Sequence, residues 1–137
     1  MNVHTVIFEE SPHNFYPLAL TRPVWSMRFG CFEFHERIAK QVAAQGLEAP
    51  LLLTGTRLSS YARDLYGDRV ITALPDGDLL CVNALATELP ALDRTRSQVF
   101  TAGNRIVCAL ILSADRSALR QRESSLDFTG LPVQEIP

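Results

Sequence analysis

The sequence predicts a three-layer α/β domain with a mainly parallel sheet and a late β-hairpin. Apolar strand-like runs alternate with helical stripes through the first half of the chain, an order typical of parallel sheets covered by helices. The strand runs are apolar on both faces, as strands buried between two layers are. A Gly-Asn pair inside the last long apolar run predicts a tight hairpin turn.

The expected elements follow the spacing of apolar residues. A helix is predicted over residues 31–46, where apolar side chains recur at three- and four-residue steps. A second helix is predicted over residues 56–68 by the stripe of Leu58, Tyr61 and Leu65. Strands are predicted at residues 5–9, 49–55, 69–74 and 79–85, the hairpin at 98–113, and a last short helix at 113–124.

The overall size and charge exclude several classes of protein. The 137 residues suit one domain, which we expect to span residues 1–137. The net charge of −2 does not favour binding to nucleic acid or to an anionic membrane surface. The apolar runs are far shorter than the roughly twenty residues of a membrane helix. The apolar tail at 126–137 has no predicted partner and suggests a piece of a longer chain.

The cysteines indicate a reducing compartment. Cys31, Cys81 and Cys108 are widely spaced, and no pair of them forms a C-x-x-C motif. A zinc site is therefore not expected. Two of the three lie inside apolar strand-like runs, where a cysteine behaves as a small buried hydrophobe. These features predict free thiols and a cytoplasmic location.

The connection between the first strand and the first helix is the most informative segment. Such connections usually hold about two to six residues, whereas this one, which contains NFYPLALTRPVWSMRFG, holds roughly twenty. It leaves the carboxyl end of a parallel strand, where ligands of α/β sheets bind. Arg22 and Arg28 can present forked donors to a phosphate, and Thr21 can add a hydroxyl. The alternative is that both arginines are solvated or pair with Glu9 and Glu10.

Asn83 is a further candidate site residue. It ends the strand LLCVNAL, so it can contact a ligand or cap the exit of the chain, and the residues leave both roles open. The sequence contains no H-E-x-x-H motif, no Walker loop and no G-x-G-x-x-G motif. No serine lies in a nucleophile-elbow context. We therefore name no catalytic residue and no metal ligand from the residues alone.

The long connection also resembles a known family. FYPLALTRPVWSMRFG followed by CFEFHERIAKQ is similar to the start of sugar-nucleotidyltransferase-like proteins. These are related to the uridylyltransferase half of the bifunctional enzyme that makes UDP-N-acetylglucosamine. The matching positions are Asn14, Pro17, Leu18, Thr21, Arg22, Pro23, Arg28 and Gly30. LLCVNALA and QVFTAGNRIVCALI resemble a later strand and hairpin of the family, so the likeness spans about residues 6 to 112.

The resemblance implies a fold, a reaction and a set of partners. The fold would be Rossmann-like, and the reaction would move a nucleotidyl group from a nucleoside triphosphate onto a sugar 1-phosphate, with release of pyrophosphate. By the match, Arg22 and Arg28 would contact phosphate, and Asn83 would lie near the sugar or the nucleotide. The implied partners are a nucleoside triphosphate or nucleotide sugar and a sugar 1-phosphate. Any Mg²⁺ would be held mainly by the nucleotide.

The chain departs from proven enzymes of this kind at two places. It lacks their glycine-rich G-x-G-T-R-M loop with a downstream lysine, and its single lysine, Lys40, lies within the predicted helix. Where they carry a metal-binding aspartate after a central strand, this chain reads VNAL. The alternatives are therefore a non-catalytic domain that binds a nucleotide sugar, and a dimerisation or assembly domain that forms a homo-oligomer.

Overall fold

The computed structural model describes residues 3–10 and 22–136, so the candidate Thr21 lies outside the described residues. Seven strands form the main sheet in the order β11-β7-β8-β6-β1-β4-β5. Their bounds are β1 Val3–Phe8, β4 Leu51–Leu53, β5 Val70–Ile71, β6 Asp78–Asn83, β7 Gln98–Ala102, β8 Arg105–Ile111 and β11 Val133–Glu135. Two small hairpins accompany the sheet, β2 Arg28–Phe29 with β3 Phe32–Glu33, and β9 Arg120–Arg122 with β10 Ser125–Asp127.

The sheet is parallel on one side and mixed on the other. β1 pairs in parallel with both β4 and β6, and β4 pairs in parallel with β5. β8 is antiparallel to β6 and to β7, while β11 is parallel to β7. The predicted α/β fold with a mainly parallel sheet and a late hairpin, β7–β8, is therefore confirmed.

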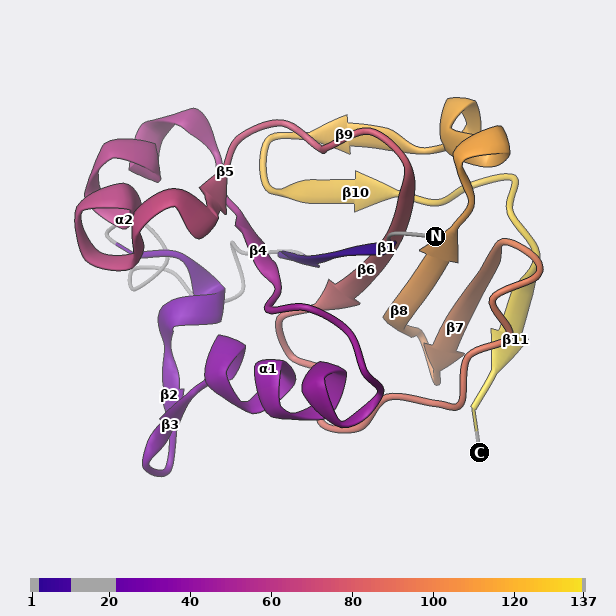
Figure 1. Ribbon diagram of the computed structural model, residues 1–137, viewed down its shortest axis with the longest axis horizontal. Coiled ribbons are helices and arrows are strands. Elements are labelled where there is room, and N and C mark those ends of the chain that lie inside the picture. Colours follow the sequence, from indigo (N-terminus) through magenta and orange to yellow (C-terminus); the bar gives the residue numbers. More distant parts are fainter. Residues whose placement is uncertain (1–2, 11–21, 137) are drawn as a thin grey trace.

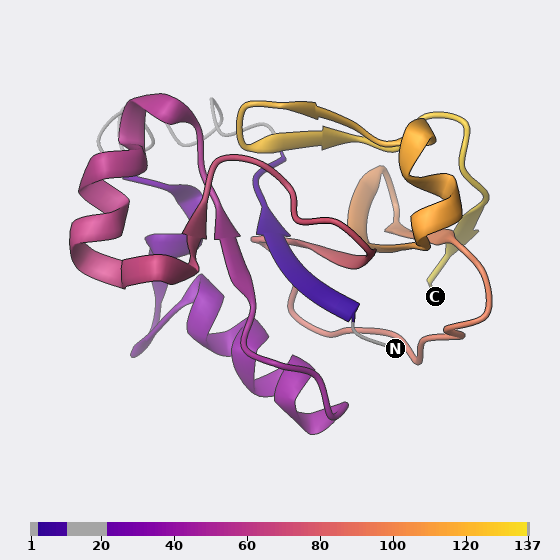
Figure 2. The ribbon, with the colours of Figure 1, turned by 45° about the horizontal axis from the view of Figure 1, so that its top comes forward.

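Two layers cover the sheet (Figures 1 and 2). The helices α1 (Phe34–Ala44) and α2 (Ser59–Tyr66) pack on one face, where Ile38 and Ala62 join the same core cluster. The β9–β10 hairpin lies on the opposite face, and Leu126 and Phe128 join the core beneath it. The three-layer arrangement thus uses a hairpin rather than helices as its second cover. None of the described helices is long and apolar enough to cross a membrane.

The first helix begins later than its apolar stripe predicts. Cys31 is exposed, and Phe32 lies in the short strand β3, so the expected start at residue 31 is wrong. The start is fixed by a capping box, in which the side chains of Glu33 and Glu36 each accept the backbone N–H of the other residue. This exchange satisfies two donors that would otherwise lack partners, and it ends the strand at Glu33.

The second helix turns a different face to the core than expected. Tyr61 and Leu65 are 46% and 59% exposed, whereas Ala62 is fully buried and Tyr66 is half-buried. Ala62 and Tyr66 are four residues apart and share one side of the helix. A small side chain at position 62 lets the helix approach the sheet, so residue size decided the face more than hydrophobicity did.

The C-terminal segment is also different from the prediction. The expected helix at 113–124 is the short 3-10 helix η6 (Ser113–Ala118) followed by the strand β9. The tail is not without a partner, because β11 pairs with β7 and Phe128 is buried. Asp78 opens β6, and its carboxylate accepts the N–H of Ser113 at 2.7 Å, which ties this segment to the sheet.

Candidate functional site

The candidate site lies at the edge of the sheet where the parallel strands β1, β4 and β6 end, which we call the carboxyl edge. The chain passes from β1 to β4 on one side, whereas β6 pairs on the other side of β1. The strand order therefore reverses between β1 and β6, and Phe8 pairs with Asn83 at their ends. Open α/β sheets bind their ligands at such a switch point.

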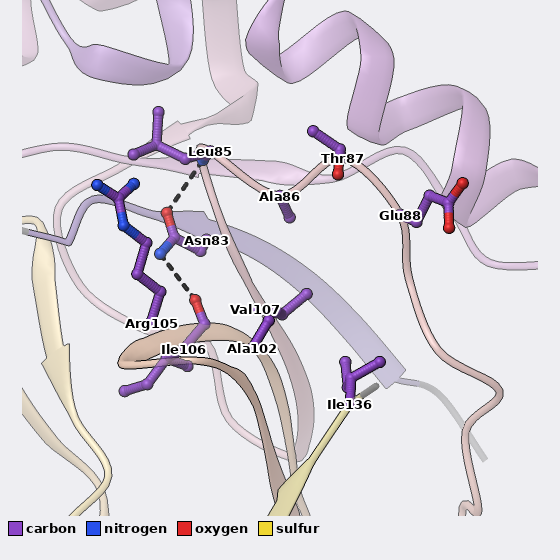
Figure 3. A pocket seen from close by; sticks show the side chains of 10 residues that line it. All are labelled: Asn83, Leu85, Ala86, Thr87, Glu88, Ala102, Arg105, Ile106, Val107 and Ile136. Atoms are coloured by element: carbon purple, nitrogen blue, oxygen red, sulfur yellow. Dashed lines mark hydrogen bonds between the residues drawn. The ribbon is translucent and has the colours of Figure 1, made fainter.

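The Asn83 side chain links the end of β6 to the neighbouring segments by hydrogen bonds. Its side chain is almost fully buried, at 2% exposure. The amide nitrogen donates to the carbonyl of Ile106 at 2.8 Å, and the amide oxygen accepts the N–H of Leu85 at 3.0 Å. Both bonds are drawn in Figure 3. Asn83 thus links the end of β6 to the β7–β8 hairpin, and one N–H and one lone pair of its amide remain for a ligand.

A cavity of about 280 Å³ opens beside this residue, and we call it the Asn83 hollow. It is bounded by the segment after β6 and by the turn between β7 and β8. The lining residues are Asn83, Leu85, Ala86, Thr87, Glu88, Ala102, Arg105, Ile106, Val107 and Ile136. Among these described residues, Arg105 is the only base and Glu88 the only acid.

Helix α1 fixes one wall of the hollow. The Gln41 side-chain amide donates to the carbonyl of Thr87 and accepts the N–H of Leu89, the latter at 2.8 Å. The two bonds clamp the segment after β6 from its outer side. The hollow is therefore built on a helix, a strand end and a hairpin, which are rigid supports for a binding site.

Neither arginine of the long connection lines the Asn83 hollow; Arg28 lies beside Glu33, and Arg22 lies close enough to Tyr66 to act on its pKa. Arg22 donates to the Ser26 side chain at 3.0 Å and to its carbonyl at 2.7 Å. Arg28 is 61% exposed, and its guanidinium lies 3.9 Å from the Glu33 carboxylate. Tyr66 donates to the same carboxylate at 2.5 Å. We call these five residues the Glu33 cluster.

Tyr66 of the Glu33 cluster packs against two further rings, those of Trp25 and His35. Trp25 is fully buried, and its indole N–H donates to the carbonyl of Leu53, the last residue of β4, at 2.9 Å. The rings of Trp25, His35 and Tyr66 pack edge to face, with centroids 5.0 to 5.8 Å apart. Burial lowers the pKa of His35, although the nearby Glu33 carboxylate opposes the shift. Burial, with the bond to Glu33, raises the pKa of Tyr66 to about 12.

Glu9 connects the end of β1 to the long connection. It follows β1 directly, is 4% exposed, and accepts the N–H of Val24 at 2.7 Å. Burial raises the pKa of its carboxyl group, and hydrogen bonds from Val24 and Ser124 oppose that shift. Glu9 therefore fixes the far end of the long connection to the sheet. The acid beside Arg28 is Glu33.

Comparison with known proteins identifies the family. A family model described as sugar nucleotidyl transferase matches residues 5–136. The chain belongs to the sugar nucleotidyl transferase family. The match agrees with the resemblance of the Thr-Arg-Pro stretch, and it spans both the Glu33 cluster and the Asn83 hollow. A search of curated proteins returned no significant match.

The described residues of this sugar nucleotidyl transferase family member contain one group of side chains that could ligate a metal ion. Glu33, His35 and Glu36 are the one described group whose ligand atoms lie together, within 4.8 Å of one another. Both carboxylates already hold the capping box, and Arg28 lies beside one of them. Mg²⁺ prefers oxygen ligands in near-octahedral geometry, and the Asn83 hollow offers a single carboxylate, Glu88. The described residues therefore do not form a dedicated Mg²⁺ site.

The sequence analysis did not predict Arg105 or Glu88 as residues of the candidate site. The signal for Arg105 was available, because the Gly103-Asn104 turn was predicted and Arg105 follows it directly. What the sequence did not show is that β8 pairs with β6, which brings the hairpin turn to the exit of β6. Glu88 lies five residues after Asn83, the last residue of β6, and belongs to no motif that would have marked it in the sequence.

Proposed function

We propose that this chain transfers a nucleotidyl group from a nucleoside triphosphate to a sugar 1-phosphate at the carboxyl edge and releases pyrophosphate. Membership of the sugar nucleotidyl transferase family supports the reaction class. The observation that carries the proposal is the position of the Asn83 hollow at the switch point between β1 and β6. That is the position at which an open α/β sheet binds its ligands.

The reaction needs groups that hold negative charge. An oxygen of the sugar phosphate attacks the α-phosphorus, a new P–O bond forms, and the bond to the bridging oxygen breaks. Pyrophosphate leaves with that electron pair. Positioned cationic donors stabilise the charge on the reacting oxygens. Arg28, which is mostly exposed, and Arg22, which has donors beyond those given to Ser26, are our proposed phosphate contacts. Thr21, which lies outside the described residues, is the third proposed contact.

A Mg²⁺ ion completes the proposal as a part of the substrate. Bound to the nucleotide, it would neutralise phosphate charge, and its ligands would be phosphate oxygens and water. This assignment fits the hollow, which supplies only Glu88 as a described carboxylate. We also propose the cytoplasm as the compartment, because all three cysteines are free thiols.

A second candidate function is binding of a nucleotide sugar without catalysis. The single lysine, Lys40, is exposed, and its ammonium group lies 3.7 Å from the centre of the Phe32 ring. A lysine in a cation–π contact outside the lining of the Asn83 hollow is not placed to contact phosphates there. Asn83 supplies an amide at the position where proven enzymes of this kind carry a metal-binding carboxylate. These two observations favour the binding-only alternative.

Pyrophosphate release separates the two functions. The chain is mixed with UTP or dTTP, Mg²⁺ and N-acetylglucosamine 1-phosphate, and pyrophosphate is measured with a coupled assay. Catalysis predicts release that requires both substrates. The binding-only alternative predicts no release, but a higher melting temperature with UDP-N-acetylglucosamine, because a ligand that binds the folded state stabilises it. Neither release nor stabilisation by any nucleotide would contradict both functions.

The phosphate role of the arginines needs matched variants. Arg28→Ala removes an exposed guanidinium from the Glu33 cluster, and Arg63→Ala removes an exposed guanidinium from α2 as a control. We expect Arg28→Ala to weaken nucleotide binding about tenfold and the control to leave it unchanged, since hydrogen bonds to charged groups contribute about 1.5–3 kcal/mol. Equal nucleotide affinity in both variants would remove Arg28 from the proposed site.

A further inference from the structure

Arg105 is a cation at the rim of the Asn83 hollow that has no acidic partner among the described residues. It opens β8, is exposed, and makes no ion pair with any acid in the described part of the chain. It stays unpaired although Glu88 lines the same hollow, and although the Glu10 carboxylate reaches the N–H of the next residue, Ile106, at 3.5 Å. A free guanidinium in a hollow is well suited to bind a phosphate through two parallel hydrogen bonds.

The opposite end of the hollow has the opposite charge. Figure 3 shows the Arg105 guanidinium on one side of the hollow and the Glu88 carboxylate on the other. Glu88 is exposed and makes no hydrogen bond or ion pair with a described residue. An ionised carboxylate only accepts hydrogen bonds, which suits hydroxyl groups, and it repels a phosphate. The hollow therefore carries a positive charge at one end and a negative charge at the other, and a ligand with one anionic end can bind in one direction only.

The size of the hollow limits what it can hold. Its volume of about 280 Å³ is slightly below that of pockets for drug-sized molecules, which span about 300–1,000 Å³. It can take one part of a nucleotide sugar and not the whole molecule. The half-buried side chains of Leu85, Val107 and Ile136 give it an apolar floor, on which the C–H face of a sugar ring can pack.

We propose that the Asn83 hollow is the subsite for the sugar 1-phosphate, with the phosphate on Arg105 and the ring hydroxyls toward Glu88. The nucleotide then lies farther along the carboxyl edge, toward Arg28 and the Glu33 cluster. This inference rests on the proposed function, because it assigns one of the two substrates of that reaction to a place. It goes beyond that function by naming Arg105 as a specificity-determining residue.

The test compares two ligands on the same variants. Dissociation constants of glucose 1-phosphate and of UTP with Mg²⁺ are measured by calorimetry for the wild type, Arg105→Ala, Arg105→Lys and the control Arg63→Ala. We expect Arg105→Ala to weaken glucose 1-phosphate at least tenfold and UTP less than threefold. Arg105→Lys should recover part of the loss, because it keeps the charge and loses the fork. Circular dichroism and the melting temperature of each free variant verify that it is folded.

Glu88→Gln tests the other end of the hollow. It keeps the size of the side chain and replaces the carboxylate by an amide that also donates. We expect it to weaken glucose 1-phosphate threefold to tenfold and to leave binding of inorganic phosphate unchanged, because phosphate alone occupies the Arg105 end. Equal effects of Glu88→Gln on the two ligands would contradict the proposed orientation.

The results distinguish this inference from the proposed function. If Arg105→Ala leaves the affinity for glucose 1-phosphate unchanged, or weakens UTP just as much, the subsite assignment is overturned while pyrophosphate release by the wild type stands. If the wild type binds UTP but no sugar phosphate, the subsite is likewise overturned. If the wild type binds neither ligand and releases no pyrophosphate, the proposed function itself fails.

Discussion

Replacement of Asn83 by alanine tests how the hollow is held together. The change deletes two hydrogen bonds, from the Leu85 N–H at 3.0 Å and to the Ile106 carbonyl at 2.8 Å. A buried polar group that loses its partner costs about 1–3 kcal/mol. Because water in the hollow can reach both backbone groups, we take the low end of that range, about 1–1.5 kcal/mol, for each. The expected loss is about 2–3 kcal/mol of unfolding free energy.

Thermal unfolding followed by circular dichroism measures this loss. For a domain of this size, 1 kcal/mol moves the melting temperature by roughly 3–5 °C, so we expect a fall of about 6–15 °C. The matched control is Asn104→Ala, in the exposed turn of the same hairpin, which should change the melting temperature by less than about 2 °C. Equal shifts for Asn83→Ala and the control would refute the idea that this amide holds the edge.

Three further predictions concern the elements around the site. Because burial raises the pKa of Glu9 above 4.5, the folded state binds its proton more tightly than the unfolded state does, and the unfolding free energy falls as the pH rises from 4.5 through the folded pKa. Urea unfolding should show this fall in the wild type and not in Glu9→Gln, and an identical pH slope in both proteins would contradict the prediction. Trp25→Phe removes the donor to the Leu53 carbonyl and should lower the unfolding free energy by about 2–3 kcal/mol in urea, whereas a loss below about 0.5 kcal/mol would show that this bond contributes little. A thiol reagent should modify only Cys31 in the native protein and all three thiols after unfolding, because the other two are buried; fast reaction of a second native thiol would contradict the packing of β6 against β8.

The sequence predicted the strands that side-chain pattern can reveal. β1, β4, β6 and the β7–β8 hairpin come from apolar runs that are buried on both faces, and burial is what such runs report. β9 was missed because Arg120, Gln121 and Arg122 are all exposed and polar. This strand is held by backbone pairing with β10, and backbone hydrogen bonds leave no trace in the hydrophobic pattern.

The candidate site was predicted in part. The position at the carboxyl edge followed from the order of strands, and Asn83, which was predicted to lie where its strand exits, is the last residue of β6. The sequence placed Arg28 and Asn83 in one site. The structure places Arg28 in the Glu33 cluster and Asn83 in the hollow, which neither Arg22 nor Arg28 lines. That separation depends on the capping box at Glu33, which holds a carboxylate beside Arg28 and is visible only once the helix start is fixed.

The most direct test of the account is a map of amide chemical shifts as UDP-N-acetylglucosamine is added. The account predicts the largest changes at the amides of Leu85, Arg105 and Ile106 and at the side-chain amide of Asn83, with smaller changes around Arg28. Changes confined to the opposite edge of the sheet, near Ser97 and Leu112, or no changes at millimolar ligand, would contradict it.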